Sequence, residues 1–200
     1  MTHTIEDKQN IERQEKAQQD QQLRENLITK VQTMQPIQAD VIVDLSEQTL
    51  TLPRYAKKYP ISSGKNGIGE AENSGKTPRG WHRISNKIGE NQPINSVFIA
   101  RQTTGEIYTQ ALALDNPQRD WILSRILWLD GLEPKFNTGE GCDTKTRYIY
   151  IHGTPDSEPM GIPLSHGCIR MRNQDLIELF DLVNENATVF ISEQHINLID

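Results

Sequence analysis

The stretch Arg147–Arg172 places one cysteine close to two histidines. His152 stands near its start, and His166 precedes Cys168 by two residues. A cysteine acts as a nucleophile when a nearby imidazole lowers its pKa or takes its proton. Gly167 lets backbone N–H groups approach a developing oxyanion. We therefore expect a catalytic Cys168 with a depressed pKa, whereas a protein that only binds a ligand would keep an ordinary cysteine pKa of about 8.5.

The local pattern predicts the elements that carry these residues. Tyr148, Tyr150 and His152 alternate with two isoleucines, which is the period-2 pattern of a β-strand. Gly153 ends the predicted strand, and a loop rich in Pro, Gly, Asp and Ser follows it. The sequence thus predicts His152 at the end of a strand and Cys168 after a loop.

Other interpretations stay open when only the residue types are considered. A single free cysteine is commonly a small buried hydrophobe, and a single histidine commonly has a structural role. Two histidines and a cysteine could also be part of a zinc site, but no fourth ligand is evident and the spacing fits no zinc finger. No metal site is therefore predicted.

A composite motif favours the nucleophile. The residues HGT at 152–154 and SHGCIRM at 165–171 resemble the signature of the YkuD-type L,D-transpeptidase and L,D-carboxypeptidase family. The segments VIVDLSEQTLTL, KKYPISSGK, SGKTPRGWHRI and ILWLDGLEPKFN resemble further blocks of the same family. The resemblance extends from Val41 to Ile191.

The resemblance implies a mostly β fold, a β-sandwich-like catalytic domain with appended helices. It also implies acyl transfer on peptidoglycan stem tetrapeptides, at the bond before the terminal D-alanine. Cys168 matches the family's nucleophile and His152 its general base. The N–H groups of Gly167 and Cys168 match the oxyanion site, while Ser165 and His166 shape the cysteine loop.

The resemblance gives the remaining site residues less definite roles. Arg170 matches an arginine that could bind a substrate carboxylate as a fork or pair with an acidic residue of the fold. Tyr150 is expected at the substrate. Gly153 stands where some relatives carry Ser, so a hydroxyl supporting His152 is not expected. No metal or organic cofactor is implied.

Composition limits the classes of partner. The chain has 200 residues, a net charge of −6 and a sequence pI of about 5.4, which argues against general nucleic-acid binding. Mean hydropathy is −0.63, and no segment is long enough for a transmembrane helix. The two cysteines form no disulfide framework. The charged, Gln-rich residues 1–20 do not resemble a secretory signal, so a cytoplasmic location is expected.

Residues 1–38 are predicted to form a polar helical extension, and residues 39–200 the catalytic domain. Apolar residues recur at helical spacing only along a narrow face near the end of the extension. Pro36 ends this predicted helix. A role in oligomerisation is the alternative to simple docking on the domain.

Within the catalytic domain the pattern predicts many short strands and one late helix. Strands are expected at 41–52 (two), 57–62, 77–84, 97–100, 106–114, 122–129 and 188–192. His82 is expected at the surface of its strand. Asn173 is predicted to cap a helix that buries Leu176, Ile177, Phe180 and Val183. The loop Gly64–Gly75 is expected to border the site.

Two outcomes of the acyl-enzyme remain open. Water would make the protein an L,D-carboxypeptidase that trims soluble muropeptides or precursors, which we expect for a cytoplasmic protein. An amine of another stem peptide would make it a periplasmic L,D-transpeptidase that forms 3–3 cross-links. A non-catalytic stem-peptide binder is the third hypothesis, although it would not require Cys168 and His152.

Overall fold

The computed structural model describes residues 16, 18, 19 and 37–196. Residues 16, 18 and 19 are helical. The rest of the predicted N-terminal helix lies outside the described residues. Residues 38–196 belong to one compact unit, which carries the predicted site.

This unit is built mainly from short strands. They are β1 (Val41–Asp44), β2 (Thr49–Leu52), β3 (Lys57–Pro60), β4 (Gly80–Ile88), β5 (Ser96–Ile99), β6 (Gln102–Ile107), β7 (Ile122–Gly131), β8 (Tyr150–Gly153), β9 (Ile169–Met171) and β10 (Thr188–Ser192). The helices are α2 (Gln110–Asp115), α3 (Asn173–Leu182) and a 3-10 turn at Pro53–Tyr55. The predicted mostly β fold is confirmed.

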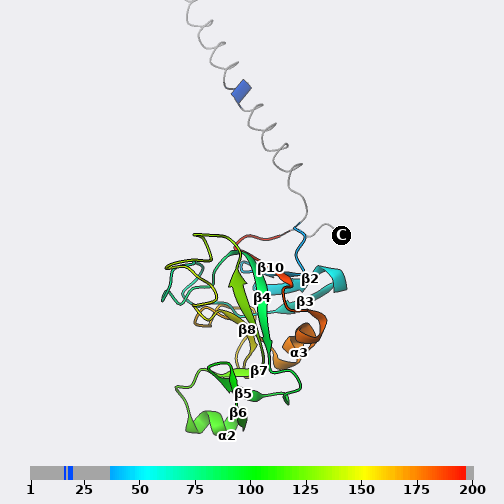
Figure 1. The fold of residues 1–200 in the computed structure, drawn as a ribbon, viewed down its shortest axis with the longest axis vertical. Helices are drawn as coiled ribbons and strands as arrows, with labels where there is room; N and C mark the ends of the chain where they lie inside the picture. Colours follow the sequence, from blue (N-terminus) through cyan, green and yellow to red (C-terminus); the bar gives the residue numbers. More distant parts are fainter. Residues whose placement is uncertain (1–15, 17, 20–36, 197–200) are drawn as a thin grey trace, which may run out of the picture. The chain divides into compact units, whose positions relative to one another are not determined.

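In the described residues the ten strands join into one sheet in the order β3-β2-β1-β10-β4-β7-β5-β6. Strand β8 branches from this path, because it pairs with β7 and also with β9. The pairs β1–β10 and β8–β9 are parallel, and the others are antiparallel. Figure 1 shows α3 (orange) beside β7 and β8, while the β5–β6 hairpin and α2 lie at the opposite end from β2 and β3.

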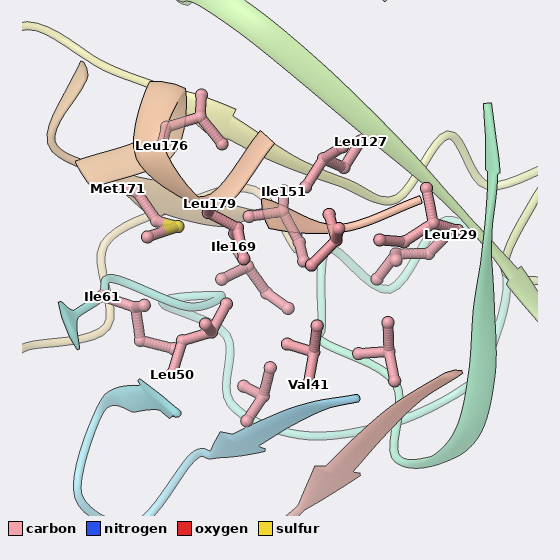
Figure 2. Close-up of a cluster of buried hydrophobic side chains, with 14 of the residues drawn as sticks. Val41, Leu50, Ile61, Leu127, Leu129, Ile151, Ile169, Met171, Leu176 and Leu179 are labelled. Carbon is pink, nitrogen blue, oxygen red and sulfur yellow. The ribbon is translucent and has the colours of Figure 1, made fainter. Parts of the chain in front are cut away.

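The main core lies between the two arms of this curled sheet. Apolar side chains from β1 and β2 meet those of β7, β8, β9 and α3 there. Figure 2 shows Ile151 and Ile169 pointing into this cluster with Val41, Leu176 and Leu179. All five are fully buried, and each such side chain stabilises the fold by roughly 1.5–3 kcal/mol.

The strand predicted at 106–114 is correct only for its first residues, because the second part of this segment is a helix. Strand β6 ends at Ile107, and α2 begins at Gln110. The Thr109 hydroxyl accepts a hydrogen bond from Leu112 N at 3.1 Å, which caps the helix. The residues that follow, Ala-Leu-Ala-Leu, are strong helix formers.

The prediction for His82 is also wrong, because His82 does not lie at the surface of its strand. Its side chain is fully buried. Nδ1 contacts Gly80 O at 3.0 Å and Nε2 contacts Thr144 Oγ1 at 3.0 Å. Both ring nitrogens are therefore satisfied inside the fold, and burial lowers the pKa of His82 to about 4.

The start of α3 differs from the prediction as well. Asn173 is the first residue of the helix, and its side chain makes no capping hydrogen bond. Leu179 is buried on the inner face, whereas Ile177 is only partly buried. The predicted last strand, Thr188–Ser192, is confirmed.

Within the part of the chain that the structure describes, no helix combines the length and apolar character needed to cross a membrane.

Candidate active site

The predicted catalytic residues come together on β8 and at the start of β9. In this parallel pair His152 is opposite Arg170, and Ile151 is opposite Ile169. The two isoleucines face the main core, so His152 and Arg170 face the other side, as period-2 alternation requires. Cys168 directly precedes β9 and packs near Tyr150 on that second face.

The Cys168 thiol is held by the backbone of the preceding segment. Its Sγ donates to Tyr148 O at 3.4 Å and accepts from Tyr150 N at 3.4 Å. Tyr148 has a left-handed backbone with φ of 56°, a conformation that is costly for a bulky residue and frequent at functional sites. The backbone thus places the thiol at a fixed position above the sheet.

Burial keeps the reacting pair neutral at rest. It raises the pKa of the Cys168 thiol to about 12 and lowers the pKa of His152 to about 4, because each charged form would be poorly solvated. This differs from the depressed thiol pKa expected from the sequence. Both groups are therefore neutral in the resting structure, and transfer of the Cys168 proton to His152 requires that bound substrate stabilise the charges that develop.

The orientation of His152 is set by its own strand. Its Nδ1 lies 2.8 Å from Gly153 O, so Nδ1 carries the hydrogen and Nε2 keeps a free lone pair. A carbonyl here takes the orienting role that a carboxylate has in many triads. Gly153 therefore supports His152 through its backbone.

A bulge in β7 lies beside this histidine. The register between β7 and β8 shifts between Leu123 and Ile126, and Ser124 between them has φ of 65°. Ser124 Oγ donates to Asn173 Oδ1 at 2.7 Å, and Asn173 Nδ2 donates to Thr154 O at 2.8 Å. The Asn173 side chain is thus used to lock the end of β8 rather than to cap α3.

The same packing explains the glycine at 153. A Cβ on Gly153 would lie 2.6 Å from Leu123 O and would also collide with Asn173 Oδ1. A Ser at this position therefore has no room without a shift of the bulge. The absence of a hydroxyl beside His152 follows from packing in this chain.

Ser165 and Gly167 shape the cysteine loop. Ser165 Oγ donates to Cys168 O at 2.5 Å and accepts from Gly167 N at 3.1 Å. Gly167 has φ of 117°, and a Cβ there would lie 3.0 Å from Lys76 O. The Gly167 N–H is already engaged, so Cys168 N–H is the oxyanion donor that this resting geometry favours.

Arg147 holds the loop that borders the cysteine. Its Nη1 donates to Glu70 O at 2.9 Å, and its Nη2 donates to Lys76 O at 2.6 Å. The Thr77 hydroxyl of the same loop donates to Gly167 O at 2.9 Å. The predicted border of the site, Gly64–Gly75, therefore lies against the cysteine loop, and Arg147 fixes it there.

Asp120 joins two of the predicted site residues. Its Oδ1 lies 2.8 Å from Arg170 Nη2, and its Oδ2 lies 3.0 Å from His166 Nδ1. Burial alone would raise the pKa of Asp120, but the hydrogen bond from His166 and the charge of Arg170 outweigh it and lower the pKa. Asp120 is therefore an ionised carboxylate at the edge of the site.

Two cavities meet at His166. One, of about 210 Å³, is lined by Asp120, Arg170 and Trp121 among others. The other, of about 240 Å³, is lined by Arg147 and Tyr148 among others. Both have His166 in their wall, and no cluster of metal-binding side chains occurs among the residues described.

Tyr150 is more enclosed than a residue expected at the substrate. It is 5% exposed, and its hydroxyl accepts from Arg101 Nη1 at 3.1 Å. The Arg101 guanidinium also stacks against Trp128 and Tyr148, at 4.8 Å from each ring centroid. Contact of Tyr150 with a substrate stays a prediction.

The model of the L,D-transpeptidase catalytic domain, YkuD, matches residues 38–191. The chain belongs to the L,D-transpeptidase family. The family match confirms the resemblance seen in the sequence. No curated protein matches this chain.

Several solved L,D-transpeptidase structures are similar. One from Mycobacterium smegmatis is 20% identical over 77% of this chain and 59% of its own, with a TM-score of 0.45. L,D-transpeptidase 3 from Mycobacterium tuberculosis with a faropenem-derived adduct is 16% identical over 76% and 59%, with a TM-score of 0.47. One from Xylanimonas cellulosilytica is 19% identical over 76% and 59%, with a TM-score of 0.43. This chain spans less than two thirds of the length of these structures.

The L,D-transpeptidase domain of this chain gathers its predicted site residues within one short stretch of two strands and a loop. Sequence reasoning missed Asp120 and Arg147. Asp120 lies 46 and 50 residues from its partners, and Arg147 lies 77 residues from Glu70. Nothing in the local pattern indicates such distant contacts.

Proposed function

We propose that this protein is a cysteine-dependent L,D-carboxypeptidase that removes the terminal D-alanine from peptidoglycan stem tetrapeptides. The observation that carries the proposal is the placement of Cys168, directly before β9, on the same face of the β8–β9 pair as His152. The thiol is fixed by backbone groups and the imidazole presents Nε2 as a base. Family membership supports a stem-peptide substrate.

Acylation begins with the proton of Cys168. His152 Nε2 takes this proton while Sγ attacks the carbonyl carbon of the third residue. Cys168 N–H donates to the oxygen that becomes negative. The intermediate then collapses, the C–N bond breaks, and His152 gives its proton to the amine of the leaving D-alanine. A thioester of the tripeptide remains on Cys168.

Deacylation reverses the roles with water as the acceptor. His152, neutral again, takes a proton from water as the oxygen attacks the thioester carbonyl. The C–S bond breaks and Cys168 recovers a proton from His152. The tripeptide leaves with a free carboxylate, and the resting pair is restored.

The cysteines provide the direct test. Cys168→Ala should abolish release of D-alanine from a purified tetrapeptide while the protein stays folded, and the matched variant Cys142→Ala should keep its activity. Cys142 contacts only loop carbonyls, whereas Cys168 lies in the site. Mass spectrometry of products, with and without added D-amino acid, measures both variants.

The same experiment separates the two outcomes of the acyl-enzyme. Tripeptide and free D-alanine support the proposal. Predominant 3–3 dimers would instead identify a transpeptidase, and product formation by Cys168→Ala would disprove the mechanism.

We also propose that the substrates are soluble muropeptides or precursors in the cytoplasm. Water is proposed as the acyl acceptor above, and water is in large excess over other stem peptides when the substrate is soluble. A fusion of residues 1–40 to a reporter that works only in the periplasm should stay inactive. An active reporter would refute the location and leave the chemistry unaffected.

A further inference from the structure

The contacts of Asp120 have the geometry of a bound carboxylate. Arg170 Nη2 donates to one oxygen at 2.8 Å, and His166 Nδ1 lies 3.0 Å from the other. The Arg170 side chain is only 9% exposed, whereas that of Asp120 is 45% exposed. A fixed, enclosed cation thus binds a carboxylate that comes from a connecting segment nearer the surface.

Apart from Asp120, Arg170 has only weak partners. Its second acidic neighbour, Glu158 Oε2, is 3.7 Å from Nη1, which is an ion pair without a hydrogen bond. Its Nη1 donates to Leu164 O at 3.5 Å, and its buried Nε has no hydrogen-bond partner among the residues that the structure describes. Because a guanidinium binds carboxylates through paired N–H groups, the contact with Asp120 alone does not use all its donors.

The position of Arg170 matches the end of the substrate. Cys168 directly precedes β9, Arg170 lies in β9, and both are on the face of the sheet that carries His152. In an attack geometry the scissile carbon lies about 3–3.5 Å from Sγ. The carboxylate carbon of the terminal residue lies three bonds farther, roughly 3–4 Å. The terminal carboxylate of a bound substrate thus lies at most roughly 7.5 Å from Sγ, on the face of the sheet that carries Arg170 and its partner Asp120.

We propose that Asp120 occupies the receptor for the terminal carboxylate of the substrate and acts as a built-in competitor that the substrate must displace. This inference rests on the proposed function, since it takes the leaving residue to be a C-terminal amino acid. Two carboxylates cannot both share Arg170 and His166 without repulsion. Displacement of Asp120 thus reduces the apparent affinity for every substrate that ends in a carboxylate.

The location of Asp120 makes the displacement feasible. It lies on the connection between α2 and β7, its side chain is nearly half exposed, and it can be rehydrated when it leaves. Ion pairs of this exposure contribute little net free energy. The apparent dissociation constant rises by the inverse of the fraction of molecules in which the receptor is open.

Binding to the unreactive Cys168→Ala protein tests the inference without turnover. The probes are one tetrapeptide ending in D-alanine as the free acid and the same peptide as its C-terminal carboxamide, measured by calorimetry. Adding Asp120→Asn should tighten binding of the acid about fivefold and leave that of the carboxamide unchanged. The matched control adds Asp115→Asn, which removes the same charge from an exposed residue of α2, and should change neither affinity.

Three results would overturn the inference. The Asp120→Asn protein binds the acid no more tightly than its parent does, or its affinity for the carboxamide rises as much as its affinity for the acid. The third is that no variant binds the acid at all. Weaker binding would mean that Asp120 holds Arg170 in place for the substrate. If the acid binds more tightly yet reactive protein releases no D-alanine, the proposed function fails and the inference stands. If reactive protein releases D-alanine but Asp120→Asn changes the affinities for the acid and the carboxamide equally, the proposed function stands and the inference fails.

Discussion

At the scale of single residues, the proposed mechanism starts from a neutral Cys168 and a neutral His152. A thiolate–imidazolium pair would store the nucleophile in its reactive form, but burial disfavours both charges here. Cys168 gains its nucleophilicity only when His152 removes the proton in the attack. The contact between His152 Nδ1 and Gly153 O matters for this reason, because it leaves Nε2 unprotonated.

This state predicts an unusual pH profile. The second-order rate of acylation of Cys168 by a carbapenem, followed by intact-mass analysis, should be nearly constant from about pH 5 to about pH 10. Below that range His152, with its pKa of about 4, begins to be protonated. Above it Cys168, with its pKa of about 12, begins to ionise. A bell-shaped profile with limbs near about pH 6.5 and 8.5 would show an ion pair instead.

At the scale of elements, the guanidinium of Arg147 holds the loop 64–77 in its position. Arg147 is partly buried and donates to carbonyl oxygens of Gly69, Glu70 and Lys76. The loop itself has little apolar side-chain content. Its position beside the cysteine loop therefore comes mainly from hydrogen bonds.

Replacing this side chain should loosen the loop. Arg147→Met should lower kcat/KM at least tenfold and reduce stability by about 1–3 kcal/mol, because several carbonyls lose their donor. Arg147→Lys keeps the charge but not the paired N–H donors of the guanidinium, so its kcat/KM and its stability should lie between those of the wild type and Arg147→Met. Steady-state kinetics and urea unfolding measure these effects.

The control is Lys58→Met, which removes an exposed cation from the edge strand β3 and should change neither quantity. Wild-type kinetics in Arg147→Met would show that the loop keeps its position without the arginine.

The sequence predicts elements best where one local pattern is sufficient. Alternation and turn residues correctly predict β1, β2 and β10, and the composite motif correctly predicts the family. The strand predicted from Tyr148 begins only at Tyr150, because Tyr148 is a turn residue with a left-handed backbone. The segment at 106–114 misled the prediction because Thr109 starts a helix directly after a strand. His82 misled it because the face of β4 that is buried depends on pairing with β7 and β10. Asp120 and Arg147 depend on contacts between distant segments, which one sequence does not reveal.

At the scale of the whole molecule, two buried neutral histidines couple folding to pH. Burial lowers the pKa of both His82 and His152 to about 4, below the ordinary value of 6.5. Between these pH values the unfolded chain binds protons that the folded protein does not. Stability is therefore complete above about pH 6.5 and is lost as the pH falls toward about 4.

The slope of this loss is measurable. The free energy of unfolding should fall by up to about 2.7 kcal/mol per pH unit between about pH 6 and pH 4.5, which corresponds to two protons taken up on unfolding. Urea titrations at several pH values give the slope. His152→Gln should reduce it by about half. A stability that stays constant over this interval would contradict the burial of neutral imidazoles.

The raised pKa of Cys168 also bears on damage by oxidants. Because burial raises the pKa of Cys168 well above its ordinary value, the thiol is protonated at pH 7. Peroxide and alkylating reagents react with the thiolate, so they should react only slowly with the protonated Cys168. A substrate or a β-lactam seated beside His152 faces no such barrier, since the base removes the proton during the attack. In the proposed mechanism Cys168 therefore resists small electrophiles and reacts only with an acyl group placed beside His152.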